Sequence, residues 1–396
     1  MKFAATSFAL LFISVFLVCF VVHAQVVNTG LVDEGAVPYQ GDLILGGNDV
    51  YVIEGDFHIN GSVIVEENAT LILRDAVVNF TQSSDWQYNL TLRNPLDGIP
   101  RLQVTNTTII SNYKYSINLG SNSSTIVYDS QFVGAQPTAY CWLSIGTVST
   151  ASFYNFSTRG LSVFGNGTFI FNSSINDLNV YSGEIHIHNS QIFVSNTYAS
   201  GVTWIYECTL TALAARDGSQ QHVLDSTIQR INAYNETVVW LTNSSFTERN
   251  LYDSSQLFIL WYLDTHVIDA NSADVPDANV TAYYPDNSIA DSELTDTNGW
   301  ARLTLMEKMV NATGEYPVGN YTVTATYETN AGQQQVNMTA NQQVTIQLPF
   351  MIPEFQTNLI LTIFVALAFL AVAICRKRKV KTCKAHFASC TQACKK

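Results

Sequence analysis

A short motif recurs along the middle of the chain: an alternating apolar segment ends in Asn, Asp or Glu, and a small residue usually follows. These repeat residues are Asp75, Asn106, Asp129, Asn155, Asn172, Asn189, Glu207, Asp225, Asn243 and Asp264. Their spacings are 31, 23 and 26 residues at first, and then 17, 17, 18, 18, 18 and 21. A period this regular indicates a stack of equivalent units rather than a series of unrelated loops.

Each unit contains the pattern of a β-strand that bends. In the unit around Asn189, Ile185 and Ile187 precede the repeat residue with a period of two, and the next apolar residue, Ile192, follows after three. The odd step predicts a bend at the repeat residue, where Asn tolerates a left-handed backbone. A short strand, a bend and another strand in every unit predict one coil of a parallel β-helix. The Asn and Asp members from Asn106 to Asp264 are expected to form a structural ladder, hydrogen-bonded from coil to coil.

In this arrangement, residues 42–267 resemble the right-handed parallel β-helix (pectin-lyase-like) superfamily, whose inner Asn ladder has the same placement. The opening coils, from Gly41 to Gln82, are similar to the start of β-helix domains on archaeal surface proteins. A β-sandwich is the alternative, but it does not explain the constant step. The expected fold class is therefore an all-β ectodomain, with residues 25–41 as its lead-in.

In residues 268–348 the sequence pattern changes to that of alternating strands separated by turn signals. They resemble a carboxypeptidase-regulatory-like (transthyretin-like) β-sandwich through the segments Val275–Val280, Thr295–Gly299 and Gly319–Val323. The resemblance implies a spacer or stabiliser without activity of its own. The run from Asp296 to Gly299 contains only half of a calcium-binding loop, so a tight turn is the favoured reading.

The two ends of the chain predict a single-pass membrane protein. Residues 1–24 have the pattern of a signal peptide, and 358–375 form an apolar segment followed by a basic cluster within the tail 376–396. This order places the N-terminus and the large domain outside the cell membrane. The linker 349–357 contains Ile-Pro-Glu-Phe at 352–355 and resembles the PEF-type sorting signal of archaeal surface proteins. The tail carries Cys383, His386, Cys390 and Cys394, for which a disordered or lipidated tail and a metal site are both open.

Charge and sequons agree with an extracellular location. Residues 25–356 hold 32 acidic and 10 basic residues, a net charge of about −22, which argues against nucleic acid or anionic lipid as a partner. Fifteen Asn-x-Ser/Thr sequons occur. Four coincide with repeat residues, and the glycosylation candidates are Asn60, Asn68, Asn79, Asn89, Asn122, Asn166, Asn235, Asn279, Asn311, Asn320 and Asn337.

Many β-helix proteins cleave acidic polysaccharides, so catalysis is the alternative function. Between Tyr115 and Glu307 there is no Lys, and the chain contains no Gly-His-Gly, Arg-Ile-Lys or Asp-Asp string of the kind that hydrolase members use. A carboxylate pair from different coils stays open, because acid–base chemistry needs proximity in space rather than in sequence. The favoured prediction is a non-enzymatic protein without cofactor or metal. Cys141 and Cys208 are expected to be packed thiols.

Aromatic residues and histidines recur at two outward positions of the repeat. Three residues before the repeat residue stand Phe169, His186, Trp204, His222, Trp240 and Trp261, and one residue before it stand Tyr128, Tyr154, Phe171, His188 and Tyr206. Stacked coils would align these rings on one outer face. Because rings rather than ligands flank His186 and His188, a metal site there is not favoured. The rings are either an interaction surface or a packed strip that a loop, a glycan or a neighbouring domain covers, and both readings are open. The predicted function is binding, adhesion or cell-envelope structure, with glycans or other envelope proteins as partners.

Overall fold

The computed structural model describes residues 25–26, 38–94, 97–350, 365–372 and 374. Strands make up 64% of the structure and helix 3%, and the expectation of an all-β protein is confirmed. The predicted signal peptide, the 352–355 motif and the Cys-containing tail lie outside the described residues. Within the apolar segment 358–375, residues 365–372 are helical. None of the helical residues that the structure describes forms a helix long and apolar enough to cross a bilayer.

In the middle of the chain, each turn contributes three strands. One turn runs through β8 (Arg101–Thr105), β9 (Thr108–Ser111) and β10 (Tyr115–Leu119), and the next runs through β11 (Ser124–Tyr128), β12 (Gln131–Gly134) and β13 (Cys141–Ile145). Each strand pairs in parallel with its counterpart one turn later, β8 with β11, β9 with β12 and β10 with β13. The chain therefore forms a stack of three-sided coils, whose sides we call the first, second and third face.

The remaining coils follow the same path with fewer breaks. Earlier strands are β1 (Gln25–Val26), β2 (Tyr39–Gln40), β3 (Leu43–Leu45), β4 (Val50–Asn60), β5 (Val63–Glu66), β6 (Thr70–Phe80) and β7 (Asn89–Arg93). Later strands are β14 (Thr150–Tyr154), β15 (Ser157–Val163), β16 (Thr168–Phe171), β17 (Ser174–His188), β18 (Gln191–Tyr206), β19 (Thr209–Ala215), β20 (Gln220–Leu224), β21 (Thr227–Ala233), β22 (Val238–Thr242) and β23 (Ser245–Leu251). From β15 onward the second and third faces merge into one bent strand, which pairs with both β12 and β13.

The period-two pattern explains why the stack has a dry interior. In β17, Ile185 and Ile187 are fully buried, whereas His186 and His188 between them point outward and are half-buried. Parallel strands keep the same parity from coil to coil, so aliphatic side chains meet aliphatic side chains inside. One apolar core runs continuously from Leu43 to Ile259.

β24 (Gln256–Ile268) carries the chain out of the stack. Its first residues pair in parallel with β22, and Gln256–His266 pair antiparallel with β27 (Trp300–Asn311). β31 (Gln342–Gln347) lies parallel to its second half. The core changes within this strand, because Leu257 and Ile259 belong to the coil core whereas Leu263 belongs to a second core. The structure therefore has no break at the predicted boundary between 267 and 268.

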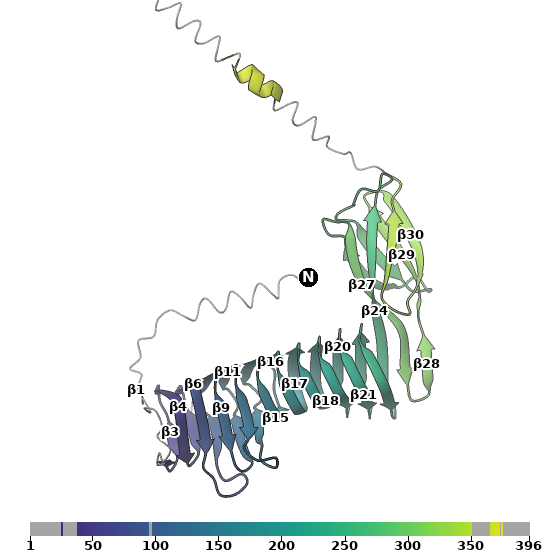
Figure 1. Ribbon diagram of the computed structural model, residues 1–396. Helices are drawn as coiled ribbons and strands as arrows, with labels where there is room; N and C mark the ends of the chain where they lie inside the picture. The colour runs from purple at the N-terminus through teal and green to yellow at the C-terminus, as the bar shows by residue number, and fades with distance from the viewer. Residues whose placement is uncertain (1–24, 27–37, 95–96, 351–364, 373, 375–396) are drawn as a thin grey trace, which may run out of the picture.

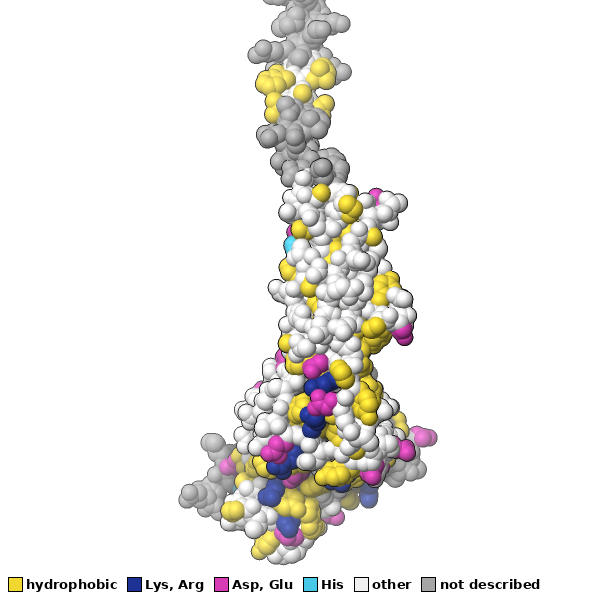
Figure 2. All heavy atoms as spheres, turned by 90° about the vertical axis from the view of Figure 1, so that its right-hand side faces the viewer, with side chains coloured by type: hydrophobic (Ala, Val, Ile, Leu, Met, Phe, Trp, Pro, Cys, Tyr) yellow, Lys and Arg dark blue, Asp and Glu magenta, His cyan; other side chains and the backbone are white. Residues whose placement is uncertain are grey.

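The second core lies between two sheets. One contains β24, β27, β31 and β28 (Gly314–Pro317), and the other has the order β26 (Ile289–Leu294), β25 (Asn279–Tyr283), β29 (Asn320–Tyr327) and β30 (Asn330–Asn337). Figure 1 shows that this two-layer unit extends sideways from the last coils, along the direction of β24. Basic and acidic side chains lie next to one another where the units meet (Figure 2). Arg249 and Lys308 both pair there with Glu315.

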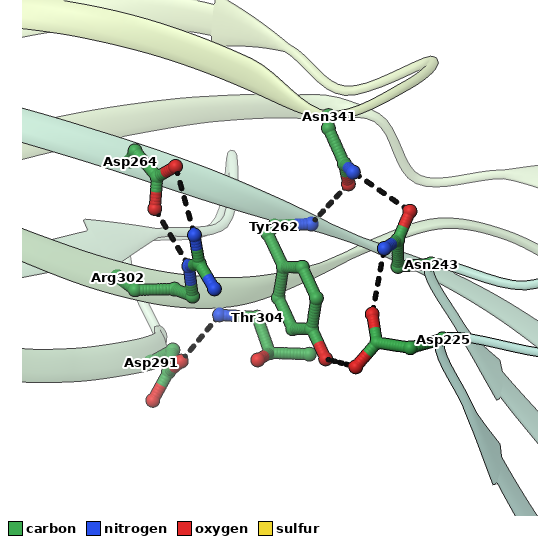
Figure 3. A network of polar contacts seen from close by, with 8 residues as sticks. All are labelled: Asp225, Asn243, Tyr262, Asp264, Asp291, Arg302, Thr304 and Asn341. Atoms are coloured by element: carbon green, nitrogen blue, oxygen red, sulfur yellow. Dashed lines mark hydrogen bonds and ion pairs between the residues drawn. The ribbon is translucent and has the colours of Figure 1, made fainter. Parts of the chain in front are cut away.

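Asp264 differs from its prediction as a ladder residue. It lies inside β24 opposite Arg302, which forms two hydrogen bonds to its carboxylate at 2.7 and 3.1 Å. The last bend of the repeat is at Asn243, and Asn341 from the second unit donates a 2.7 Å hydrogen bond to its side-chain oxygen (Figure 3). Tyr262 adds a hydrogen bond from its hydroxyl to Asp225 at 3.2 Å. These contacts join the second unit to the last coils.

Candidate functional site: stacked rings beside a polar corner

The bend after the first face is the same in nine successive coils. Nine of the ten repeat residues, from Asp75 to Asn243, have positive φ values between 46° and 54°. Asn and Asp occupy this left-handed region at lower cost than most residues, because their short polar side chains bond locally. The side chains of Asn106, Asn155 and Asn189 are exposed to solvent. The expected ladder is therefore on the outside of the coil, and not inside as in the superfamily that the sequence resembles.

The outer ladder is hydrogen-bonded in pairs. The side-chain amide of Asn106 donates to Asp75 at 2.8 Å, and Asn155 donates to Asp129 at 2.7 Å. Asn243 donates to Asp225 at 2.6 Å. In each pair a carboxylate of one coil accepts from an amide of the next, so these carboxylates help to fix the coil register.

The inner ladder is built from the next residue along the chain, which is usually Ser. The Ser190 hydroxyl accepts the backbone N–H of Ser173 at 3.0 Å and donates to the carbonyl of His188 at 2.7 Å. Ser130, Ser173, Ser226 and Ser244 occupy the same slot and donate in the same way. Cys208 takes this slot in its own coil, accepts from Ser190 N–H at 3.3 Å, and is buried, which raises the pKa of its thiol to about 11. Such a thiol is a packed group at neutral pH.

The rings on the first face form two columns. Column 1 consists of Phe169, His186, Trp204, His222, Trp240 and Phe258, with neighbouring ring centroids 3.8–6.2 Å apart and planes within 15° of parallel. Column 2 consists of Tyr128, Tyr154, Phe171, His188 and Tyr206, with centroids 4.4–5.0 Å apart. The two columns run side by side, because the ring of His186 is also 6.4 Å from that of Tyr206.

Trp261 is not a member of column 1. The residue that stacks on Trp240 is Phe258, which lies opposite it in the register of β22 and β24. Trp261 instead packs between the two cores, and its indole N–H donates to Glu307 at 2.6 Å. The other predicted ring residues lie in the two columns.

Stacking decides which part of each ring meets solvent. Because the planes are nearly parallel and follow the stack, the faces of each inner ring are covered by its neighbours, and its edge points outward. Aromatic faces carry the negative part of the ring quadrupole and edges the positive part. The columns therefore present two rows of ring edges, and a free ring face is available only where a column ends.

The histidines are adapted to the stack as neutral rings. Burial lowers the pKa of His186, and Glu184, whose carboxylate lies 3.2 Å from the imidazole, acts in the opposite direction. Burial and then the neighbouring His186 lower the pKa of His188. Burial also lowers the pKa of His222 between two indole rings. At neutral pH these side chains therefore act as flat aromatic groups rather than charges.

A shallow groove of about 430 Å³ follows the polar corner beside column 2. Side-chain amides and hydroxyls dominate its lining, which consists of Asp129, Ser130, Gln131, Asn155, Phe156, Ser157, Asn172, Ser173, Ser174, Asn189 and Gln191. Across the described ranges, no group of three or more His, Cys, Asp or Glu is placed to hold a metal ion. The groove therefore offers hydrogen bonds to a ligand, with little charge.

A third column was not found from the sequence. Phe164, Tyr181 and Tyr198 stack with centroids 4.8 and 5.1 Å apart, and Arg216 follows with its guanidinium 6.0 Å from the Tyr198 ring and 4.8 Å from the Tyr234 ring. Tyr252 completes the column. Each member lies nine residues after a repeat residue, so the same period could have located this column. Arg216 maintains the stack by cation–π contacts on both sides.

The glycosylation candidates lie at the surface. None of the eleven is buried, and Asn68, Asn122, Asn166 and Asn235 lie in turns that precede first-face strands. Cys141 is buried, and burial raises the pKa of its thiol.

No protein-family model matches the chain, and no curated protein matches it.

Proposed function

We propose that this chain is a membrane-anchored surface glycoprotein whose coil stack is a right-handed parallel β-helix that binds neutral glycans of a cell envelope or cell surface. In this proposal the second unit is a carboxypeptidase-regulatory-like sandwich that joins the stack to a C-terminal transmembrane helix. The parallel register of strands one coil apart supports the β-helix assignment. The two-layer arrangement around the second core supports the sandwich assignment.

The observation that carries the binding role is the groove of amides and hydroxyls beside column 2. Amide groups both donate and accept hydrogen bonds, as do the hydroxyls of sugars. The ring edges of Tyr154 and Phe171 add apolar surface next to Asn155 and Asn172. Ligand sites commonly combine apolar walls with a few placed polar groups, and this groove has that composition.

Charge favours a neutral ligand over an acidic one. Arg74, Arg93, Arg230 and Arg302 pair with carboxylates. A polyanion would therefore meet few unpaired cations and an ectodomain with a large excess of acidic residues.

The test is a binding screen of the purified full chain against neutral and acidic glycans, with a polysaccharide-cleavage assay in parallel. We expect binding to neutral glycans without turnover. Gln191→Ala and Ser174→Ala should weaken it, whereas Thr227→Ala, at the equivalent position of a coil outside the groove, should not. Cleavage of any uronate polymer, or no glycan bound at all, would contradict the proposal.

The proposed anchoring has its own test. Protease added to intact cells should remove the coil stack and leave an epitope placed after Lys396 protected. Permeabilised cells provide the control, since the epitope should then be digested as well. Digestion of the epitope on intact cells would refute the proposed orientation.

A further inference from the structure

Column 1 has a vacant position directly above its first ring. In the register of β14 and β16, Ser152 lies opposite Phe169, and one coil earlier Ile126 lies opposite Ser152. All three side chains point outward on the first face. The series Ile126, Ser152, Phe169 therefore interrupts a row of large side chains with one small one.

At the far end of each column a large side chain lies opposite the last ring, whereas Tyr128 at the first end of column 2 lies opposite Thr105. Phe258 at the far end of column 1 lies opposite Met309 of β27. In column 2, Tyr206 lies opposite Leu224 at its far end. Phe169 is the most exposed residue of the two columns, at 39%.

The vacancy has the height of one ring. Two coils separate Ile126 from Phe169, or about 9.6 Å at about 4.8 Å per coil. A flat ring placed midway would lie about 4.8 Å from each neighbour, within the spacing that column 1 already shows. Tyr154 on the same coil borders the vacancy on one side, and Thr150 borders it on the other.

We propose that this vacancy is a subsite for one neutral pyranose ring of a glycan. A pyranose is as flat as this position requires, and its axial C–H groups stack on an aromatic face such as that of Phe169. Its hydroxyls project sideways toward Ser152, Thr150 and the solvent. This inference rests on the proposed function and names the position at which a sugar ring stacks.

Filling the vacancy with a side chain provides the sharpest test. Ser152→Phe would place a ring between Ile126 and Phe169, extending column 1 without opening a gap. Gln103→Phe is the matched control, since it adds the same ring to the same outward row one coil beyond Ile126. Phe169→Ala removes the stacking face itself.

The experiment is calorimetric titration of the full chain with cellohexaose, maltohexaose and mannohexaose. The wild-type chain and Gln103→Phe should bind one of them with similar affinity. Ser152→Phe and Phe169→Ala should weaken that binding at least tenfold. Thermal unfolding checks folding, and Ser152→Phe should melt no lower than the wild type.

Three outcomes would overturn the subsite. They are unchanged binding in a folded Ser152→Phe chain, no binding of any hexaose by the wild type, and binding that appears only in Asn166→Gln, which would mean that the chain's own glycan fills the vacancy. If Ser152→Phe binds normally while Gln191→Ala does not, the proposed function stands and the subsite is wrong. Only a screen in which no glycan binds would contradict both the proposed function and the subsite.

Discussion

The hydroxyl of Ser190 illustrates how much one small buried group can stabilise. Ser190→Ala would leave the backbone N–H of Ser173 without its acceptor inside the stack. An unsatisfied buried donor costs about 1–3 kcal/mol, so the free energy of unfolding should fall by that amount in urea titrations. Ser174→Ala, at an exposed neighbouring position, should change it by less than about 0.5 kcal/mol. Equal effects of the two substitutions would contradict the inner ladder.

At Cys208, in contrast, a substitution is expected to leave stability unchanged or to raise it. Its sulfur accepts from Ser190 N–H and lies 3.1 Å from the carbonyl of Tyr206, the same two contacts that Ser makes elsewhere in this slot. Cys208→Ser should therefore fold normally, with a melting temperature equal to or above that of the wild type, because a hydroxyl forms stronger hydrogen bonds than a thiol. Cys208→Val, which lacks a polar atom, should melt lower.

The stacked histidines predict how stability depends on pH. The folded-state pKa values of His186, His188 and His222 lie below the usual value of about 6.5, so the unfolded chain takes up protons first as pH falls. Their contribution is present above pH 6.5 and is lost as pH falls through that value toward the folded pKa values. Urea midpoints should drop accordingly between pH 7.5 and 5. Replacing all three with Phe should flatten this part of the profile, and an unchanged profile would show that other groups cause it.

At the scale of elements, the bend is the part of a coil where a substitution is expected to reduce stability most. Asn189 has a φ of 54°, where a β-branched residue is strained and Gly is not. Asn189→Val should lower the free energy of unfolding by about 1–3 kcal/mol, whereas Asn189→Gly should be close to neutral. Chemical denaturation of the two variants gives the comparison. Similar losses for both would mean that the amide, rather than the backbone, stabilises the bend.

The sequence predicts the coils from Asn155 to Asn243 well because each has one strong local signal, an Asn, Asp or Glu at a fixed spacing. It fails at the last coil for a physical reason. A step of 18 from Asn243 reaches Trp261, and a Trp there does not favour the left-handed bend, so β24 continues straight into the second unit. Asp264 is the next acidic residue after this position, and the residue three before it is Trp261 rather than Phe258.

Other parts of the site depend on contacts that no local pattern encodes. The outward direction of the Asn side chains and the inward direction of the Ser side chains follow from the backbone at the bend, which the sequence indicates only as a break in alternation. The vacancy at Ser152 is visible only once the register of β11, β14 and β16 is known. The long insertions before Asn155 hide that register from a search for a fixed period.

At the scale of the whole molecule, a stack with contacts only between neighbouring coils should tolerate the loss of one complete coil. Deleting residues 190–207 joins Asn189 to Cys208, which restores the bend, the inner ladder and both ring columns. The shortened chain should be secreted and resist protease, with a stack about 4.8 Å shorter. Small-angle scattering measures the length. Deleting nine residues instead of 18 should abolish folding, and equal behaviour of the two deletions would refute a repeating stack.

The direction of β24 has a consequence for how such a protein would stand on a cell. Strands run across the axis of the stack, and β24 continues straight into the unit that precedes the proposed anchor. With that anchor in the membrane, the axis of the coil stack would run parallel to the cell surface, and the second unit would hold the stack above it. Adding coils would then widen the area that one molecule covers without raising it, so the number of repeats sets lateral reach and the second unit alone sets height.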